Sequence, residues 1–164
     1  MSRTITAQDL NLTLHNNDEA CLFKWLIASF LMGKRIRAEI AAQAYRVIVD
    51  KHQRDTPRKL AHCRHADLVA MLGEAGYARY DESTADRLVA LARQLNVEYA
   101  GKVLNIHEAS ADRSEFEQRL QAFKGIGPKT VEIFMREASS ALYGVNVSSA
   151  PAGASLKLPT KVGR

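Results

Sequence analysis

The chain has 164 residues, of which 46% are hydrophobic and 25% are charged, and this composition excludes a disordered or fibrous protein. Its two cysteines, Cys21 and Cys63, are too few for a disulfide framework. The most hydrophobic run, residues 21–32, is too short to cross a bilayer. The net charge of +5 favours a polyanionic partner, either nucleic acid or an acidic membrane face. Because the N-terminus carries no secretory signal, we expect a cytoplasmic protein.

The first half of the chain predicts three helices. Residues 18–32 are apolar on nearly all sides of a helix, so we expect this segment to be the central buried helix. Gly33 ends it, and residues 36–52 predict a second helix with one apolar face. A third, short helix begins at Thr56 and Pro57, because threonine caps helices and proline suits the first helical position.

The second half predicts further helices and no strand. Residues 66–74 form one, and Asp81 or Ser83 caps the next. Ser114 and Glu117 have the spacing of a capping box for the helix that follows them. No segment alternates with the period of a strand, so we predict an all-α, multi-helical fold.

The predicted boundaries divide the chain into three parts. An N-terminal segment covers residues 1–17, and the helical domain covers residues 18–143. Residues 144–164 lose the helical pattern and are rich in serine, alanine, proline and glycine, which predicts a flexible basic tail.

The most informative segment is residues 124–130, which read Lys-Gly-Ile-Gly-Pro-Lys-Thr. We expect both glycines to adopt positive φ and to let the backbone approach another surface. Pro128 suits the first turn of a helix, whose unpaired amides and dipole then form an anion site. Ile126 is expected to point into the core. The segment therefore predicts a hairpin that grips the phosphate backbone of DNA, and the alternative is a plain pair of helices joined by a glycine turn.

A second basic region lies between residues 34 and 64, where nine lysines and arginines accompany three acidic residues. We interpret it as an edge that faces DNA, because the hairpin needs a second contact surface to orient a duplex. The alternative is a solvated surface with ordinary salt pairs. The side chains expected on phosphates are Lys34, Arg35, Arg37, Arg54, Arg58 and Lys59.

The segment 123–131 resembles the hairpin of the helix-hairpin-helix DNA glycosylase superfamily, in particular its endonuclease III-like members. Residues 22–28 resemble the buried helix of that family, and Thr56-Pro57 and residues 76–80 follow in the expected order. The resemblance implies a two-lobed, all-α fold with a cleft between the lobes. It also implies a DNA-binding protein of base-excision repair, acting as a monomer in the nucleoid on double-stranded DNA with a damaged or abasic site.

The resemblance also implies site residues. Lys129 matches the lysine that attacks the sugar C1′ in bifunctional members, which forms a Schiff base and leads to β-elimination. Such an amine needs a pKa lowered by desolvation or by nearby positive charge. The implied DNA-binding residues are Lys34, Arg35, Arg37, Lys124, Gly125, Ile126, Gly127, Lys129 and Thr130. Lys34 stands near the position of the family's wedge residue, which enters the DNA.

The sequence departs from the family in two respects. Val147 occupies the position of the family's catalytic aspartate, and no acidic residue follows Glu137. No cysteine follows Cys63, so we expect neither an iron–sulfur cluster nor any other cofactor. Two functions therefore remain open: a DNA glycosylase or abasic-site lyase, and a catalytically inactive module that binds damaged or distorted DNA. A helical protein-interaction domain is a third alternative.

Three other groups of residues have two interpretations each. His62, Cys63 and His65 lack the usual zinc spacing, so we expect a polar helix end and no metal. Glu132 either pairs with Lys129 or stands in for the missing aspartate. The aromatic side chains that either stack on a base or pack in the core are Tyr77 and Tyr80.

Overall fold

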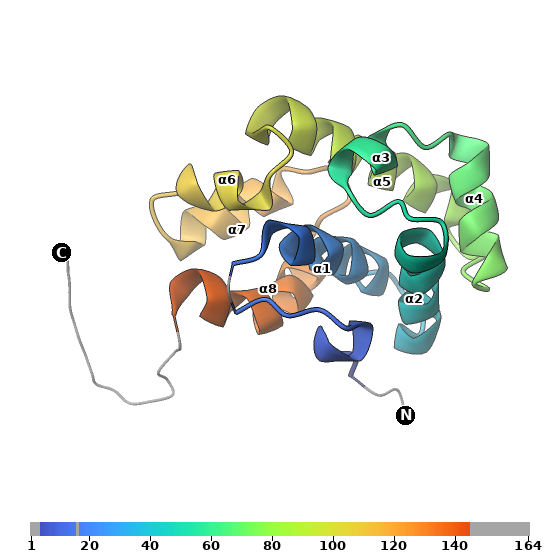
Figure 1. Ribbon diagram of the computed structural model, residues 1–164, viewed down its shortest axis with the longest axis horizontal. Coiled ribbons are helices and arrows are strands. Elements are labelled where there is room, and N and C mark those ends of the chain that lie inside the picture. The colour runs from blue at the N-terminus through green and yellow to red at the C-terminus, as the bar shows by residue number, and fades with distance from the viewer. Residues whose placement is uncertain (1–3, 16, 145–164) are drawn as a thin grey trace.

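The computed structural model describes residues 4–15 and 17–144, and every regular element within them is helical (Figure 1). The all-α prediction is therefore confirmed for this part of the chain. The predicted tail lies outside it, apart from Gly144. The helices are α1 (Glu19–Met32), α2 (Ala38–Tyr45), α3 (Pro57–Ala61), α4 (His65–Glu74), α5 (Asp81–Tyr99), α6 (Val103–Glu108), α7 (Arg113–Gln121) and α8 (Pro128–Tyr143).

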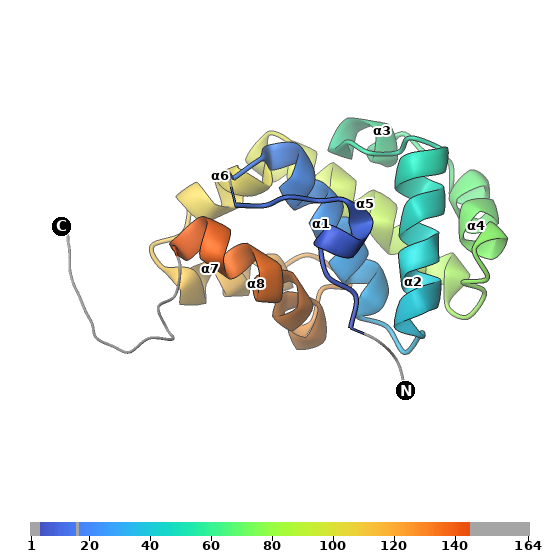
Figure 2. The same ribbon diagram turned by 60° about the horizontal axis from the view of Figure 1, so that its bottom comes forward.

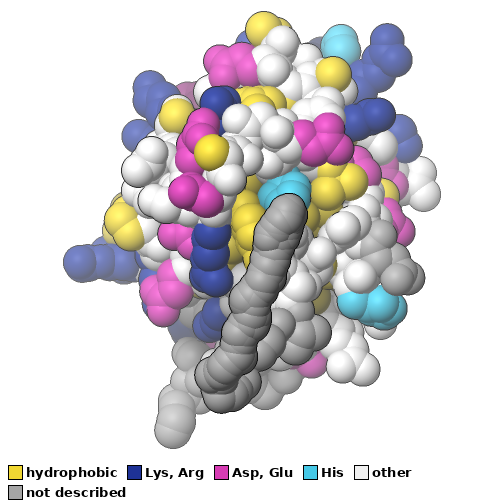
Figure 3. All heavy atoms as spheres, turned by 90° about the vertical axis from the view of Figure 1, so that its left-hand side faces the viewer, with side chains coloured by type: hydrophobic (Ala, Val, Ile, Leu, Met, Phe, Trp, Pro, Cys, Tyr) yellow, Lys and Arg dark blue, Asp and Glu magenta, His cyan; other side chains and the backbone are white. Residues whose placement is uncertain are grey.

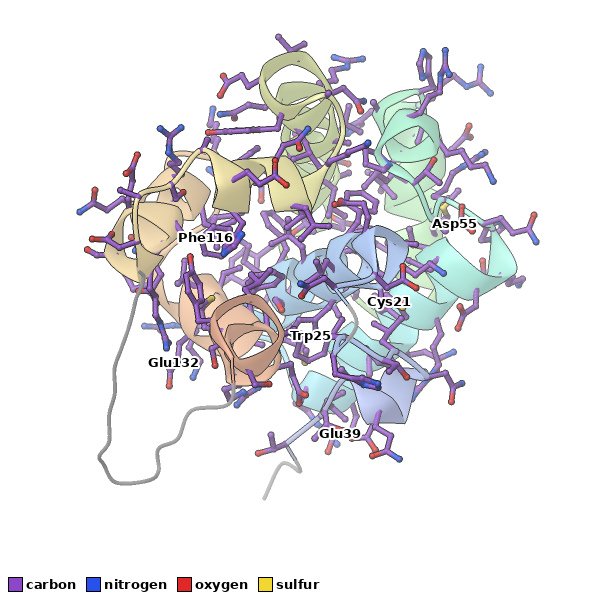
Figure 4. All side chains as sticks on the ribbon, turned by 60° about the vertical axis from the view of Figure 1, so that its left-hand side comes forward. Cys21, Trp25, Glu39, Asp55, Phe116 and Glu132 are labelled. Atoms are coloured by element: carbon purple, nitrogen blue, oxygen red, sulfur yellow. The ribbon has the colours of Figure 1, made fainter. Side chains whose placement is uncertain are left out.

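Helix α1 forms the centre of the molecule, as its sequence predicts. It contacts α2, α6 and α8, and Leu22, Trp25 and Leu26 on it are fully buried. The indole Nε1 of Trp25 donates a hydrogen bond of 3.1 Å to the carbonyl oxygen of Phe134, which joins α1 to α8 (Figure 4). A helix that is apolar on all sides is stable only inside the protein, because each of its faces then has a packing partner.

The other helices pack on both sides of α1. Helices α2, α3 and α4 lie on one side of it and α6, α7 and α8 on the other, while α5 contacts α3, α4 and α6 (Figure 1). The N-terminal residues 4–15 run across α1 between α2 and α8 (Figure 2). They bury Ile5, Leu10, Leu12 and Leu14, so this segment shares the hydrophobic core of the helices that follow it.

Local signals place several helix ends correctly. Asp18 caps α1 by accepting hydrogen bonds from the amides of Ala20 and Cys21, and Thr56 caps α3 with Pro57 at its first position. The second predicted helix changes character within its length, because α2 ends at Tyr45 and a π-helical segment, Arg46–Lys51, follows.

Three helix starts differ from the prediction. The N-cap residue of α5 is Tyr80 rather than Asp81 or Ser83, and no side chain caps this helix. Asp112 caps α7 in place of Ser114, and Glu115 in turn accepts from the amide of Ala111. Helix α6 has no sequence signal at its start, because its cap comes from α1: the carboxylate of Glu19 accepts from the amides of Val103 and Leu104. A cap 84 residues away in the sequence cannot be read from local spacing.

None of the helices in the described ranges has both the length and the apolar character needed to cross a membrane.

Candidate nucleic-acid interface

The segment between α7 and α8 forms a tight turn. The amide of Ile126 donates to the carbonyl oxygen of Phe123 at 3.1 Å, and Gly125 has a φ of 91°. Phe123 and Ile126 are 1% and 4% exposed, so their side chains anchor the turn in the core. The inward position expected for Ile126 is therefore confirmed.

Gly125 is required both by its backbone and by its neighbours. Its positive φ is rare for residues with a side chain. A Cβ at this position would lie 2.9 Å from Cδ of Arg87 and 3.0 Å from Cε2 of Phe30. The end of α1 and the first part of α5 therefore both pack directly against the turn.

The prediction of a positive φ is wrong for Gly127. Its φ of −108° and ψ of −172° describe an extended backbone that any residue can adopt. It is the N-cap residue of α8, and α8 has no side-chain cap. A Cβ on Gly127 would meet no protein atom within 4 Å. The space in front of the first turn of α8 is therefore open, although Gly127 does not need a left-handed backbone.

A groove of about 480 Å³ runs along the turn. Among the residues that the structure describes, four basic side chains line it and no carboxylate does. No ion pair neutralises these four side chains within residues 4–15 and 17–144. The four are Lys34 from the turn after α1, Arg87 from α5, and Lys124 and Lys129 from the hairpin.

The chemistry of this groove is that of an anion site. The first backbone amides of α8 lack intrahelical acceptors, and the dipole of this 16-residue helix adds positive potential at the same point. Lys124 and Lys129 are exposed on either side of Gly127. Unpaired cations next to free amides favour a phosphate or a carboxylate of a bound partner.

Lys34 is partly buried at the base of the turn. Its ammonium nitrogen lies 3.4 Å from the carbonyl oxygen of Gly125, to which it donates, and 4.8 Å from the centre of the Phe30 ring. Burial lowers the pKa of Lys34, and the positive charge of Arg87 lowers it further. The structure thus brings the predicted residues Lys34, Lys124 and Lys129 together on one groove.

Two other predicted contact residues lie outside the groove, and a third, Thr130, borders it with a buried side chain. Arg35 and Arg37 are exposed on the connection between α1 and α2, and they do not line the groove. Thr130 is 2% exposed, and a Cβ on Gly33 would collide with its hydroxyl oxygen. The side chain of Thr130 therefore packs α8 against the end of α1 at the edge of the groove.

Sequence reasoning missed Arg87, which completes the groove. Arg87 is half-buried and precedes the buried Leu88 on α5, and an arginine beside the apolar face of an amphipathic helix is common. Its proximity to Gly125 depends on how α5 lies across the hairpin. No local spacing could have indicated it.

The basic region of residues 34–64 includes side chains that face acids. Lys51 pairs with Glu74, and Lys59 pairs with Asp55 at 3.3 Å. Arg64 pairs with Asp67 at 3.2 Å. The expected phosphate contact of Lys59 therefore competes with an ion pair.

Two arginines of the same region differ from one another. Arg54 is half-buried beside Cys63, whose pKa is raised by burial against an opposing effect of Arg54. Arg58 stays exposed. Arg54 is therefore poorly placed to reach a phosphate.

The acidic candidate of the hairpin helix points away from the groove. Glu132 projects from α8 into solvent (Figure 4), where it lines a different pocket together with Arg113 and Arg136. The described residues show no ion pair between Glu132 and Lys129. Val147, at the position of the family's aspartate, lies outside the described residues.

The two tyrosines have different environments. Tyr77 is fully buried and donates to the carbonyl oxygen of Leu31 at 3.2 Å, so it is a core residue. Tyr80 is 42% exposed, with the guanidinium of Arg79 lying 5.2 Å from the centre of its ring. Of the two, Tyr80 alone has a ring that a nucleotide could reach.

The histidines near Cys63 make separate contacts. His62 Nδ1 lies 2.8 Å from the carbonyl oxygen of Arg58. His65 bridges Glu82 at 2.7 Å and Asp86 at 2.8 Å, and the hydrogen bond to Glu82, with the nearby Asp86, raises the pKa of its imidazole. His65 thus joins the start of α4 to α5.

Charges alternate elsewhere on the surface. On the face formed by α6, α7 and the end of α8, basic and acidic side chains are interspersed (Figure 3). The ion pairs Arg113–Glu117 and Arg119–Glu115 lie along α7. This face lacks the uniform positive charge of the groove.

Comparisons with protein-family models, with curated proteins and with solved structures gave no match to this chain.

Proposed function

We propose that this chain binds double-stranded DNA by holding a backbone phosphate in the groove at the hairpin. The observation that carries the proposal is the gathering of four basic side chains, without a carboxylate, around the open N-terminus of α8. Backbone phosphates are the anions that such an arrangement suits, because amides and lysines together neutralise a diester oxygen. The resemblance of residues 123–131 to the helix-hairpin-helix DNA glycosylase superfamily supports duplex DNA as the source of the phosphate.

Within this proposal, the resemblance assigns the protein to base-excision repair. The enzyme favoured is an abasic-site lyase rather than a glycosylase. A lyase needs an amine, and the groove offers Lys34, Lys124 and Lys129. Excision of a base is promoted by a carboxylate that stabilises positive charge on the sugar, and none lines the groove.

A second candidate is a binding module without catalytic activity, in which the same groove recognises abasic or distorted DNA. The missing carboxylate also favours this candidate. The two candidates share the phosphate contact and differ only in whether an amine reacts with the sugar.

Gly127→Ala tests the phosphate contact. The added methyl group meets no protein atom within 4 Å, but it enters the space in front of the α8 amides. Replacing an N-cap glycine by alanine costs about 1 kcal/mol or less of stability. We expect a folded variant whose affinity for a short duplex falls by about tenfold, which corresponds to ~1.4 kcal/mol.

The matched control is Gly73→Ala, an exposed glycine in α4 that also has open space around it. Fluorescence anisotropy with a labelled duplex measures both variants at several salt concentrations. An unchanged affinity in Gly127→Ala, or an equal loss in both variants, contradicts the proposal.

A further inference from the structure

We propose that Lys34, rather than Lys129, is the amine that forms an imine with the aldehyde of an abasic site held in the groove. This inference rests on the proposed binding of duplex DNA. It differs from what the resemblance implies, because the family's lysine position corresponds to Lys129.

The first argument is the position of the amine. Nζ of Lys34 is held between the carbonyl oxygen of Gly125, at 3.4 Å, and the face of the Phe30 ring, at 4.8 Å. Gly125 lies in the hairpin turn, and Phe30 lies near the end of α1 with its ring against that turn. Lys129 is exposed in the first turn of α8, where its ammonium group makes no hydrogen bond or ion pair with any of the described residues. A nucleophile whose position is fixed before the substrate arrives reacts faster than one that must first be ordered.

The second argument is the charge around this amine. The charged groups that line the groove with Lys34 are Arg87 from α5 and Lys124 and Lys129 from the hairpin. All are positive, so no carboxylate of the groove stabilises its ammonium form, although the carbonyl oxygen of Gly125 and the face of the Phe30 ring do. Burial and Arg87 together lower the pKa of Lys34, which increases the fraction of neutral amine that can attack a carbonyl carbon.

The third argument is the geometry that a nucleotide requires. Lys34 and the open N-terminus of α8 line the same groove. We place the phosphate beside Gly127 and the sugar of the same nucleotide on the side of the turn after α1, which lines the same groove. In this arrangement Lys124 and Lys129 hold the phosphate, and Lys34 faces the sugar.

The chemistry is a condensation. The neutral amine of Lys34 adds through its lone pair to C1′ of the open-chain aldehyde. Both amine hydrogens then leave with the aldehyde oxygen as water, and a C1′=Nζ double bond remains. Because the base is already absent from this substrate, the step needs no carboxylate to promote cleavage of a glycosidic bond.

Borohydride trapping tests the inference. The full chain is incubated with a duplex that contains one abasic site, and borohydride reduces any imine to a stable secondary amine. Lys34→Arg keeps a positive charge in the groove but removes the nucleophile. We expect its adduct yield to fall at least about tenfold when the yield is normalised to the fraction of duplex bound.

The comparison variants are Lys129→Arg and Lys59→Arg. Lys129→Arg still forms the adduct when corrected for its altered affinity. Lys59→Arg, which lies outside the groove and pairs with Asp55, matches the unsubstituted protein. Peptide mapping of the unsubstituted protein's adduct identifies the modified lysine without any variant, and we expect Lys34.

The outcomes separate this inference from the proposal on which it rests. Modification of Lys129, or loss of the adduct in Lys129→Arg alone, overturns the assignment to Lys34. Tight binding of the duplex without any adduct also overturns it but leaves duplex binding intact. Failure to bind the duplex overturns both.

Discussion

Two basic regions of this molecule are candidates for DNA contact in the sequence, and they differ in the structure. Residues 34–64 hold nine basic residues against three acidic ones, whereas the hairpin contributes only Lys124 and Lys129. In the structure, Lys51 and Lys59 of the first region pair with Glu74 and Asp55. The hairpin lysines instead join Lys34 and Arg87 in a groove without an acid.

The difference shows that the number of basic residues in a segment is a poor guide to an anion site. A lysine that already faces a carboxylate must give up that pair to bind a phosphate, although an exposed pair contributes little stability by itself. Cations that face one another repel, and a bound anion relieves this repulsion. A bound phosphate is therefore more favourable in the groove than beside the paired lysines of residues 34–64.

The largest expected effect comes from removing the unpaired charges. In the double variant Lys124→Ala/Lys129→Ala, we expect duplex affinity at low salt to fall by about 10–100-fold. We also expect the slope of log K against log salt to become shallower by about 2, because each lost phosphate contact removes about 0.9 from it. Fluorescence anisotropy at several salt concentrations measures both quantities.

The matched control is Lys51→Ala/Lys59→Ala, which removes the same net charge from the paired region. We expect its affinity and its salt slope to change far less. Equal effects in the two double variants would show that binding depends on overall charge rather than on the groove.

An intermediate effect is expected from Gly125→Ala. The methyl group would collide with Arg87 and Phe30 and would force alanine into a φ of 91°. We expect the free energy of unfolding to fall by about 1–3 kcal/mol, which urea denaturation monitored by circular dichroism measures. Gly127→Ala, at the neighbouring turn position, should lose duplex affinity with little loss of stability.

Gly73→Ala provides the control for the glycine substitution itself. Gly73 lies within α4 with open space around it, and alanine is favoured there by up to about 1 kcal/mol. A Gly125→Ala variant as stable as the unsubstituted protein would contradict the packing of α1 and α5 against the turn.

The smallest effect concerns His65, whose pairing with Glu82 and Asp86 lies outside the groove. Its pKa is raised above the ordinary value of 6.5, chiefly by the hydrogen bond to Glu82. The stability that protonated His65 contributes is therefore fully present below the unfolded pKa and is lost as the pH rises through the folded pKa. We expect His65→Gln to lower Tm slightly at acidic pH and to match the unsubstituted protein at alkaline pH.

Differential scanning fluorimetry at about pH 5.5 and about pH 8.5 measures this difference. Duplex affinity at a fixed pH should be the same in His65→Gln and in the unsubstituted protein. A larger Tm difference at the alkaline pH would contradict the assigned pairing, because it would give the contribution the opposite sign.

The sequence by itself determined most of the helices and the core of the hairpin. The central helix α1, the cap at Thr56 and the inward position of Ile126 all follow from spacing within a few residues. Such features are set by backbone hydrogen bonds and by the period of apolar residues, both of which are local. The sequence also indicated Lys34, Lys124 and Lys129 as candidates for one surface.

Only the tertiary structure decided how those candidates are arranged. Lys34 reaches the carbonyl of Gly125 across 91 residues of sequence, and Arg87 joins them because α5 lies against the hairpin. The burial of Thr130 against Gly33 likewise depends on how α8 meets α1. These contacts depend on which helix faces pack together, and many sequences with the same local pattern would pack differently. The charge of each side chain is encoded in the sequence, whereas its neighbours are decided by the packing of the fold.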